Sequence, residues 1–329
     1  MNKKTTASLA VCGLLAIAGV AQAQISGAGA TFPELLYNNW AKEYKAAGGS
    51  AVNYQGIGSG GGIKAITAKT VDFGASDGPM SPAELQGAPG ILHLPMCIGG
   101  VVPAFNIQGV TELKLTGAVI ADIYLHKINT WNDPKIAALN PGVKLPPTRI
   151  VTVSRADSSG TTAIFTNYLC KVSPAFESGV GEGKAVNWPK PGIAGKGTQG
   201  VAALVKQTPG AFGYIEAAFA DKNQISYASV QNAKGAFIKA SLKSVTEAAT
   251  SVRLPSDFRA MITNTSDAEG YAISGFTWIL VYPDAKPEVK KFLRWCLTTG
   301  QKSATKYDYA PLPAPVQQRA LAALAKIGG

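Results

Sequence analysis

Residues 150–165 read IVTVSRADSSGTTAIF and carry the clearest local signal in the chain. Residues 150–155 form a short run rich in β-branched side chains, which is typical of a strand. Small polar residues follow at 158–160, and from Ile164 to Leu169 apolar residues recur at helical spacing. A helix that begins directly after a strand presents unpaired backbone N–H groups and the positive end of its dipole at the turn. The stretch therefore predicts an α/β protein with a place for an anion at this turn.

The same order of strand, turn and helix recurs along the chain. AVNYQGIG at 51–58 runs into SGGGIKAITAK, and TVDFGASD at 70–77 is a strand that ends in a polar turn. Near the start, GAGATFPELLYNNWAKEYKAAGG at 27–49 predicts a helix with Pro33 in its first turn and a stop at glycine. Strands that alternate with helices predict an α/β fold with largely parallel sheets. Residues 231–270 are polar and weakly patterned, which indicates an irregular region.

Three turns rich in glycine or hydroxyl residues each open a predicted helix: 30–32 (ATF), 58–60 (GSG) and 159–161 (SGT). Serine and threonine are ordinary N-caps, so one such turn taken alone is better explained by helix capping. Three of them, with Arg155 and Asp157 beside the third, favour a shared anion site.

The first 23 residues have the parts of a secretory signal peptide. Lys3 and Lys4 form a positive start, Ala7–Val20 is an uncharged apolar run, and residues 21–23 (AQA) match the A-x-A cleavage pattern. The apolar run is too short for a transmembrane helix. The sequence therefore predicts export by a cleavable signal peptide, with a mature chain that begins at Gln24.

The mature chain stays basic, because loss of Lys3 and Lys4 lowers the formal net charge only from +11 to +9. It has no long run of Lys or Arg, and its aromatic residues do not interleave with basic ones. Nucleic acid is therefore not expected as a partner.

Histidines and cysteines are too few and too scattered to predict a metal site. His93 and His126 have no metal-ligand spacing around them, and we interpret both as structural or surface residues. Of the four cysteines, Cys12 lies in the predicted signal peptide. The mature chain keeps three, Cys97, Cys170 and Cys296, an odd number that leaves at least one thiol free, and we interpret them mainly as small buried apolar residues. No metal and no cofactor are predicted. A mature chain of about 300 residues more often forms two domains than one.

GAGATFP, VNYQGIGSGGG, VDFGASDGPMS and RADSSGTT occur in this order, and IGGVVPAFNI, DIYLHKINTWNDP and PGAFGYIE are further matches to one family. With these motifs the mature chain closely resembles the periplasmic phosphate-binding proteins of bacterial ABC-type phosphate importers. The resemblance implies the two-lobe periplasmic-binding-protein fold, with phosphate in the cleft between two α/β lobes. It also implies a two-segment hinge, with the chain crossing near 97–101 and near 271–275. After the signal peptide, the implied lobes are residues 24–97 plus 274–329 (lobe 1) and 98–273 (lobe 2).

The resemblance also assigns the ligand contacts, residue by residue. The implied phosphate contacts are Thr31, Phe32 (through its backbone), Ser59, Asp77, Arg155, Ser159, Gly160 (through its backbone) and Thr161, with Asp157 as the partner that holds Arg155. The sequence departs from the family pattern at two places. Gly60 stands where the family often has a second serine, and Ser158 stands where glycine is common. Both departures affect local backbone freedom without removing an assigned contact.

Asp77 is an acidic residue in a site for an anion, and its chemistry suggests a filter. An ionised carboxylate only accepts hydrogen bonds. Phosphate that carries a proton can donate one to it, whereas sulfate cannot, and a buried group left unpaired can reject an analogue by ~10⁴-fold. The alternative for Asp77 is a structural cap after the strand. For Arg155 and Asp157 the alternative is an ordinary surface ion pair.

Two other functions remain open from the residues alone. A secreted phosphoester hydrolase would use Ser59 or Ser159 as its nucleophile, but it needs an activating base or a metal that the sequence does not offer. A binding protein for sulfate or molybdate is disfavoured by Asp77. The resemblance implies a non-catalytic monomer that delivers phosphate to the membrane permease and ATPase subunits of an importer.

Overall fold

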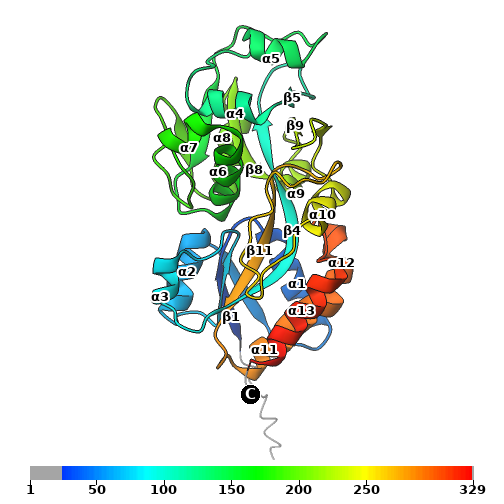
Figure 1. The fold of residues 1–329 in the computed structure, drawn as a ribbon. Coiled ribbons are helices and arrows are strands. Elements are labelled where there is room, and N and C mark those ends of the chain that lie inside the picture. Colours follow the sequence, from blue (N-terminus) through cyan, green and yellow to red (C-terminus); the bar gives the residue numbers. More distant parts are fainter. Residues whose placement is uncertain (1–23, 328–329) are drawn as a thin grey trace, which may run out of the picture.

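The computed structural model describes residues 24–327, which form two lobes joined by long strands (Figure 1). The predicted signal peptide, residues 1–23, lies outside the described residues. A mixed sheet of eight strands runs through both lobes in the order β2-β1-β3-β11-β4-β8-β6-β7, and a small sheet has the order β10-β9-β5. The strands are β1 (Ile25–Gly29), β2 (Val52–Gly56), β3 (Phe73–Ser76), β4 (Leu92–Phe105), β5 (Lys114–Leu115), β6 (Val151–Arg155), β7 (Ile193–Gly195), β8 (Ala211–Glu216), β9 (Ser229–Gln231), β10 (Phe237–Ile238) and β11 (Ser274–Val281).

Helices cover the sheet in each lobe, and most of them follow a strand in the sequence. They are α1 (Glu34–Ala46), α2 (Ser59–Thr67), α3 (Pro82–Gln86), α4 (Gly117–Tyr124), α5 (Pro134–Leu139), α6 (Gly160–Val172), α7 (Pro174–Gly179), α8 (Gly197–Gln207), α9 (Ala217–Lys222), α10 (Leu242–Thr250), α11 (Pro287–Trp295), α12 (Gln301–Ser303) and α13 (Ala314–Ala325). A π-helical turn, η1 (Cys296–Gly300), and a 3₁₀ turn, η2 (Ala304–Tyr307), flank α12.

The large sheet corrects the prediction of largely parallel sheets. Its outer pairs are parallel, namely β1 with β2 and β3, and β6 with β7 and β8. Its centre is antiparallel, because β3 pairs with β11, β11 with β4, and β4 with β8 in opposite directions. The alternation of strands and helices predicts only the outer parts. The two central strands are crossing segments, and their direction is set by the path of the chain between lobes.

One strand, β4, belongs to both lobes. Residues Leu92–Gly100 pair with β11, and residues Val101–Phe105 pair with β8. We use lobe 1 for the part built on β2-β1-β3, β11 and the first half of β4, and lobe 2 for the part built on the second half of β4 with β8-β6-β7. In Figure 1 lobe 1 lies below, with α1–α3 and the C-terminal helices, and lobe 2 lies above, with α4–α8.

The local signals around the first quoted stretch are confirmed. β6 ends at Arg155, Ser159 caps α6, and its hydroxyl oxygen accepts the N–H of Thr162 at 3.1 Å. The prediction of an irregular region at 231–270 was incomplete, because α10 lies within it. Ser241 caps this helix: its hydroxyl oxygen accepts the N–H of Ser244, and its own N–H donates to the Ser244 hydroxyl oxygen.

Each lobe has its own aromatic cluster within the core. In lobe 1, Tyr54 stacks on Phe73 with ring centroids 6.0 Å apart. In lobe 2, Phe165 stacks on Tyr214 with centroids 4.4 Å apart. Rings such as these bury a large apolar area and make each lobe a packed unit. Within residues 24–327 no helix combines the length and apolar character needed to cross a membrane.

Candidate anion-binding site

The structure brings the three predicted turns together where the lobes meet. The turn before α2 contacts the turn before α6 directly: Ser59 Oγ accepts the Gly160 N–H at 2.9 Å, and the Gly60 N–H donates to Ser158 O at 3.0 Å. The turn before α1 reaches lobe 2 as well, since Thr31 Oγ1 accepts the N–H of Thr198 at 3.2 Å. Turns from distant parts of the sequence thus form one buried polar cluster.

The four hydroxyl groups predicted for the site share one feature: each oxygen accepts a hydrogen bond from an N–H group. A hydroxyl that accepts in this way keeps its own proton for donation, so it acts as a donor toward a ligand. The pairs are Thr31 Oγ1 with Thr198 N (3.2 Å), Ser59 Oγ with Gly160 N (2.9 Å), Ser159 Oγ with Thr162 N (3.1 Å) and Thr161 Oγ1 with Arg155 Nη1 (3.4 Å). The Thr31 and Thr198 hydroxyls also lie 3.0 Å apart, and either can donate to the other.

Arg155 and Asp157 form a buried fork and not a surface ion pair. Arg155 Nε donates to Asp157 Oδ1 at 2.8 Å, and Nη2 donates to Oδ2 at 2.6 Å. The side chains are only 2% and 14% exposed, and Oδ1 also accepts the N–H of Gly197 at 2.9 Å. Burial alone would raise the pKa of Asp157, but the hydrogen bonds and charge of Arg155 outweigh it and hold that pKa below its usual value. The fork fixes the guanidinium plane and leaves Nη1 directed at Thr161.

Asp77 lies at the end of β3 and is 1% exposed. Its Oδ1 accepts the hydroxyl proton of Thr277 at 2.8 Å, and its N–H donates to Ser59 Oγ at 3.2 Å. Burial raises the pKa of Asp77 to about 7, although Thr277, the charge of Arg155 and Ser59 act in the opposite direction. The carboxyl group therefore changes charge near neutral pH.

Phe32 and Gly160 support the site in two ways, Phe32 through a backbone hydrogen bond and Gly160 through its small size. The backbone oxygen of Phe32 accepts the Tyr309 hydroxyl at 2.7 Å, which fixes the chain just before α1. A Cβ on Gly160 would lie 2.5 Å from Ser59 Oγ and 2.6 Å from Asp77 Cβ. Only glycine therefore lets the lobes approach this closely at the start of α6.

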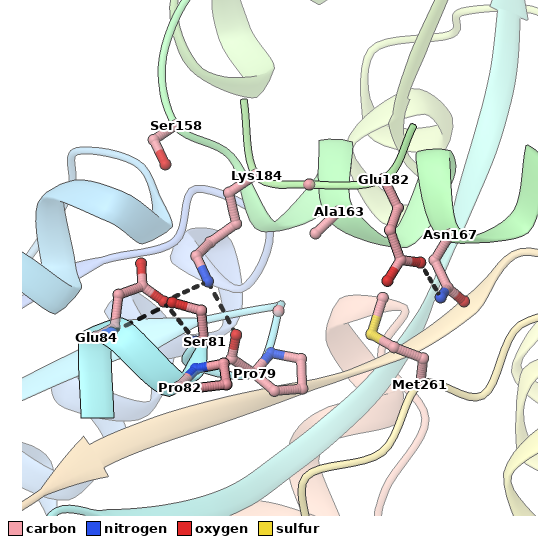
Figure 2. A pocket seen from close by; sticks show the side chains of 12 residues that line it. Pro79, Ser81, Pro82, Glu84, Ser158, Ala163, Asn167, Glu182, Lys184 and Met261 are labelled. Carbon is pink, nitrogen blue, oxygen red and sulfur yellow. Dashed lines mark hydrogen bonds and ion pairs between the residues drawn. The ribbon is translucent and has the colours of Figure 1, made fainter. Parts of the chain in front are cut away.

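Next to these turns a cavity of about 510 Å³ lies between the lobes (Figure 2). Lys184 of lobe 2 reaches into lobe 1, where Nζ donates to Glu84 Oε2 at 2.8 Å and to Pro79 O at 2.9 Å. Glu84 is held in place by its reciprocal capping bonds with Ser81. The backbone oxygen of Lys184 accepts the N–H of Ser159 at 2.7 Å. The lysine that forms the ion pair between the lobes is therefore hydrogen-bonded to one of the predicted ligand residues.

Comparison with known proteins places the chain in a family. A family model described as a PBP superfamily domain matches residues 16–299. The phosphate-binding protein PstS of Pasteurella multocida is 46% identical over 308 residues, which cover 91% of this chain and 89% of that protein. PstS of Xylella fastidiosa is 44% identical over 299 residues, which cover 88% and 82%. The chain belongs to the PstS family of phosphate-binding proteins.

Solved structures agree on the fold of this PstS-family chain. The structure of a high-affinity periplasmic phosphate-binding protein with bound phosphate at pH 8.5 is similar, with a TM-score of 0.72 and 23% identity over 91% of this chain and 93% of that one. The prediction of a two-lobe periplasmic-binding-protein fold is therefore confirmed.

The two departures from the PstS pattern lie opposite each other. A Cβ on Gly60 would lie 2.3 Å from Ser158 Oγ and 2.4 Å from Ser158 Cβ. A serine at both positions would overlap, so the small residue at 60 makes room for the larger one at 158. The side chain at this contact comes from lobe 2 in this PstS-family chain.

Sequence reasoning missed several residues that support the site. Tyr214 accepts the N–H of Arg155 at 3.2 Å, Thr198 contacts Thr31, and Thr277 holds Asp77. Tyr214 lies within the quoted PGAFGYIE motif and Thr198 lies in the first turn of α8, but nothing local marks either one as a neighbour of the site. Lys184 is one lysine among many. Their role depends on which strands and helices meet, which no local pattern in the PstS-family chain reveals.

The structure shows the surroundings of the histidine and cysteine residues that were interpreted from the sequence as structural. His93 Nε2 accepts the N–H of Met80 at 3.2 Å, and burial lowers its pKa to about 4, so it is a neutral structural residue at physiological pH. Cys97 and Cys296 are buried, and Cys170 is half-buried. Among residues 24–327, no group of three or more His, Cys, Asp or Glu side chains is placed to hold a metal ion.

Proposed function

We propose that this chain binds inorganic phosphate between its lobes and delivers it to the membrane permease and ATPase subunits of an ABC-type importer. The observation that carries the proposal is the set of four buried hydroxyls whose oxygens already accept N–H bonds, next to a guanidinium held by Asp157. A buried phosphate loses its hydration and needs such donors to replace it. The PstS relatives support the same ligand by name. The proposed contacts are Thr31, Phe32, Ser59, Asp77, Arg155, Ser159, Gly160 and Thr161.

Asp77 favours phosphate over other tetrahedral anions. When it is ionised, its free acceptor can take the proton that phosphate carries. Sulfate has no proton there, so it would bring acceptor against acceptor in a buried setting. This argument disfavours the alternative of a sulfate- or molybdate-binding protein.

The hydrolase alternative finds little support in the site. A serine nucleophile needs a base that accepts its proton. Within the described residues, Ser59 Oγ and Ser159 Oγ accept backbone N–H groups, and neither is hydrogen-bonded to a histidine or carboxylate side chain. We therefore infer that the chain is not an enzyme.

Closure of the lobes around the ligand is part of the proposal. We take residues 24–97 plus 274–329 as lobe 1 and 98–273 as lobe 2, a boundary close to Gly100, after which β4 changes its pairing partner from β11 to β8. The proposed contacts come from both lobes, so phosphate binds the closed arrangement better and shifts the protein toward it. We also propose export by a cleavable signal peptide and action as a monomer.

Calorimetric titration with phosphate and then with sulfate tests the ligand. Phosphate should bind in a 1:1 ratio, sulfate far more weakly, and a phosphomonoester should not be hydrolysed. Equal affinity for the two anions, or turnover of the ester, would refute the proposal. The intact mass of the exported protein should match a chain that begins at Gln24. Light scattering should give the mass of one chain. A retained Met1 or a dimer mass would refute those two parts separately.

A further inference from the structure

Thr277 lies on β11, one of the two strands that join the lobes, and is fully buried. Its hydroxyl is 2.8 Å from Asp77 Oδ1, although 200 residues separate the two in the sequence. An ionised carboxylate cannot donate, so the hydroxyl must donate to it. Oδ1 of Asp77 is therefore committed to Thr277, and a proton carried by a ligand meets competition at that oxygen.

We propose that Thr277 is the positioning residue that keeps Asp77 an acceptor and so selects which protonation state of an oxyanion the site admits. This inference rests on the proposed function, because it concerns how the same site tells phosphate from sulfate.

The surroundings of Asp77 make its charge depend closely on this bond. Burial raises the pKa of Asp77 to about 7. The hydrogen bond from Thr277 opposes this rise more strongly than the charge of Arg155 or the hydrogen bond from Ser59. A side chain at position 277 without the hydroxyl would leave Oδ1 of Asp77 buried and unpaired, which destabilises the ionised carboxylate more than the neutral acid. The pKa of Asp77 must then rise further, and near neutral pH the carboxyl group becomes a donor.

Few other groups around Asp77 change charge between pH 6 and 9. The titratable groups that face it are Tyr37 on α1, Tyr54 on β2, Arg155 on β6, Cys97 on β4 and Tyr309 before α13. Burial raises the pKa of both the thiol and the three phenols well above their usual values, so all four stay neutral. Arg155 stays charged.

Among residues 24–327, Glu216 is the nearby group that can change charge in this range. It is hydrogen-bonded to Tyr309, with 3.2 Å between Oε2 and the phenol oxygen, and burial raises its pKa to about 8. A Glu216→Gln background therefore separates its titration from that of Asp77.

The inference predicts a distinct pH profile for sulfate. Sulfate can bind only when Asp77 carries the proton, so above the pKa of Asp77 its affinity should fall tenfold for each pH unit. We call the pH at which the sulfate affinity begins to fall the break in the profile. Thr277→Val keeps the shape of threonine without the donor, and it should move this break to higher pH. Thr277→Ser keeps the donor and should leave the break in place.

The experiment is calorimetric titration of the full mature chain with sodium phosphate and with sodium sulfate from pH 6 to 9. Wild type, Thr277→Val and Thr277→Ser are compared, each also in the Glu216→Gln background. We expect the break in the sulfate profile of Thr277→Val to rise by at least ~1 pH unit. The ratio of phosphate to sulfate affinity at pH 8 should fall at least ~10-fold, and circular dichroism should show an unchanged fold.

A break that stays in place overturns the inference, even if Thr277→Val weakens both anions equally, because a purely structural residue would act in that way. If the valine variant does not fold, Thr277→Ala carries the same expectation and the same refutation. Movement of the break in Thr277→Ser also contradicts the inference. Failure of the wild type to bind phosphate would refute the proposed function itself, and that result is distinct from the others.

Discussion

Replacing Lys184 by methionine tests whether the ion pair between the lobes contributes to ligand affinity. Lys184 Nζ donates to Glu84 Oε2 at 2.8 Å and to Pro79 O at 2.9 Å, both across the contact between lobes (Figure 2). These bonds require closed lobes, because in an open form all three groups would face water. Methionine keeps much of the apolar stem and removes only the charge and its donors.

The expected magnitude follows from partial burial. The Lys184 side chain is 12% exposed and Glu84 is 28% exposed, so the pair lies between a surface ion pair and a buried one. Exposed pairs contribute ~0.2–1 kcal/mol, and hydrogen bonds to charged groups contribute ~1.5–3 kcal/mol. We expect Lys184→Met to destabilise the closed form by about 1.5 kcal/mol, which raises the Kd for phosphate about 10-fold. Most of the change should appear in the dissociation rate.

A double-mutant cycle with Glu84→Gln, measured by calorimetry and stopped flow, isolates the pair. Glutamine at this position still serves the capping pair with Ser81, so α3 should stay intact. Lys69→Met is the matched control, since the ion pair of Lys69 and Asp284 is exposed and lies within lobe 1. A coupling energy near zero, or an equal loss of affinity in the Lys69 control, would refute the reasoning.

Three further outcomes are expected. Asp77→Asn adds a donor and removes a charge, so its phosphate-to-sulfate affinity ratio should drop at least ~10-fold by calorimetry; an unchanged ratio would place the filter elsewhere. Gly160→Ala sets a methyl group 2.5 Å from Ser59 Oγ and should weaken phosphate binding ~10–100-fold, whereas Gly179→Ala, with its nearest neighbour at 3.8 Å, should have no effect. X-ray scattering should show a smaller radius of gyration with phosphate, and an equal radius at saturation would count against closure.

Local sequence signals predicted the parts of the site that lie on turns. Ser59 and Ser159 each stand where a strand gives way to a helix, and the physics of a helix start marks such positions without knowledge of the fold. The resemblance to a family then predicted Asp77 and Arg155 as members of the same site. These predictions required only short windows of sequence.

Contacts between distant segments could not be predicted in this way. Thr277 meets Asp77 because β11 lies beside β3 in the sheet, and Lys184 meets Glu84 because the lobes approach each other. Gly60 and Ser158 looked like two separate departures, yet they face each other across the lobes. The antiparallel centre of the sheet escaped prediction for the same reason, since the path of the chain decides it and not the composition of either strand.

The position of β11 also has a consequence for how the chain is made. This strand lies between β3 and β4, so without it the eight-stranded sheet would divide into β2-β1-β3 and β4-β8-β6-β7. Residues 274–281 are synthesised after all the strands they join, so a growing chain holds two half-sheets with open edges until they emerge. Such edges invite pairing with other chains, and sheet contacts between distant segments form slowly. The pairing of β11 with β3 and β4 therefore closes both open edges at once.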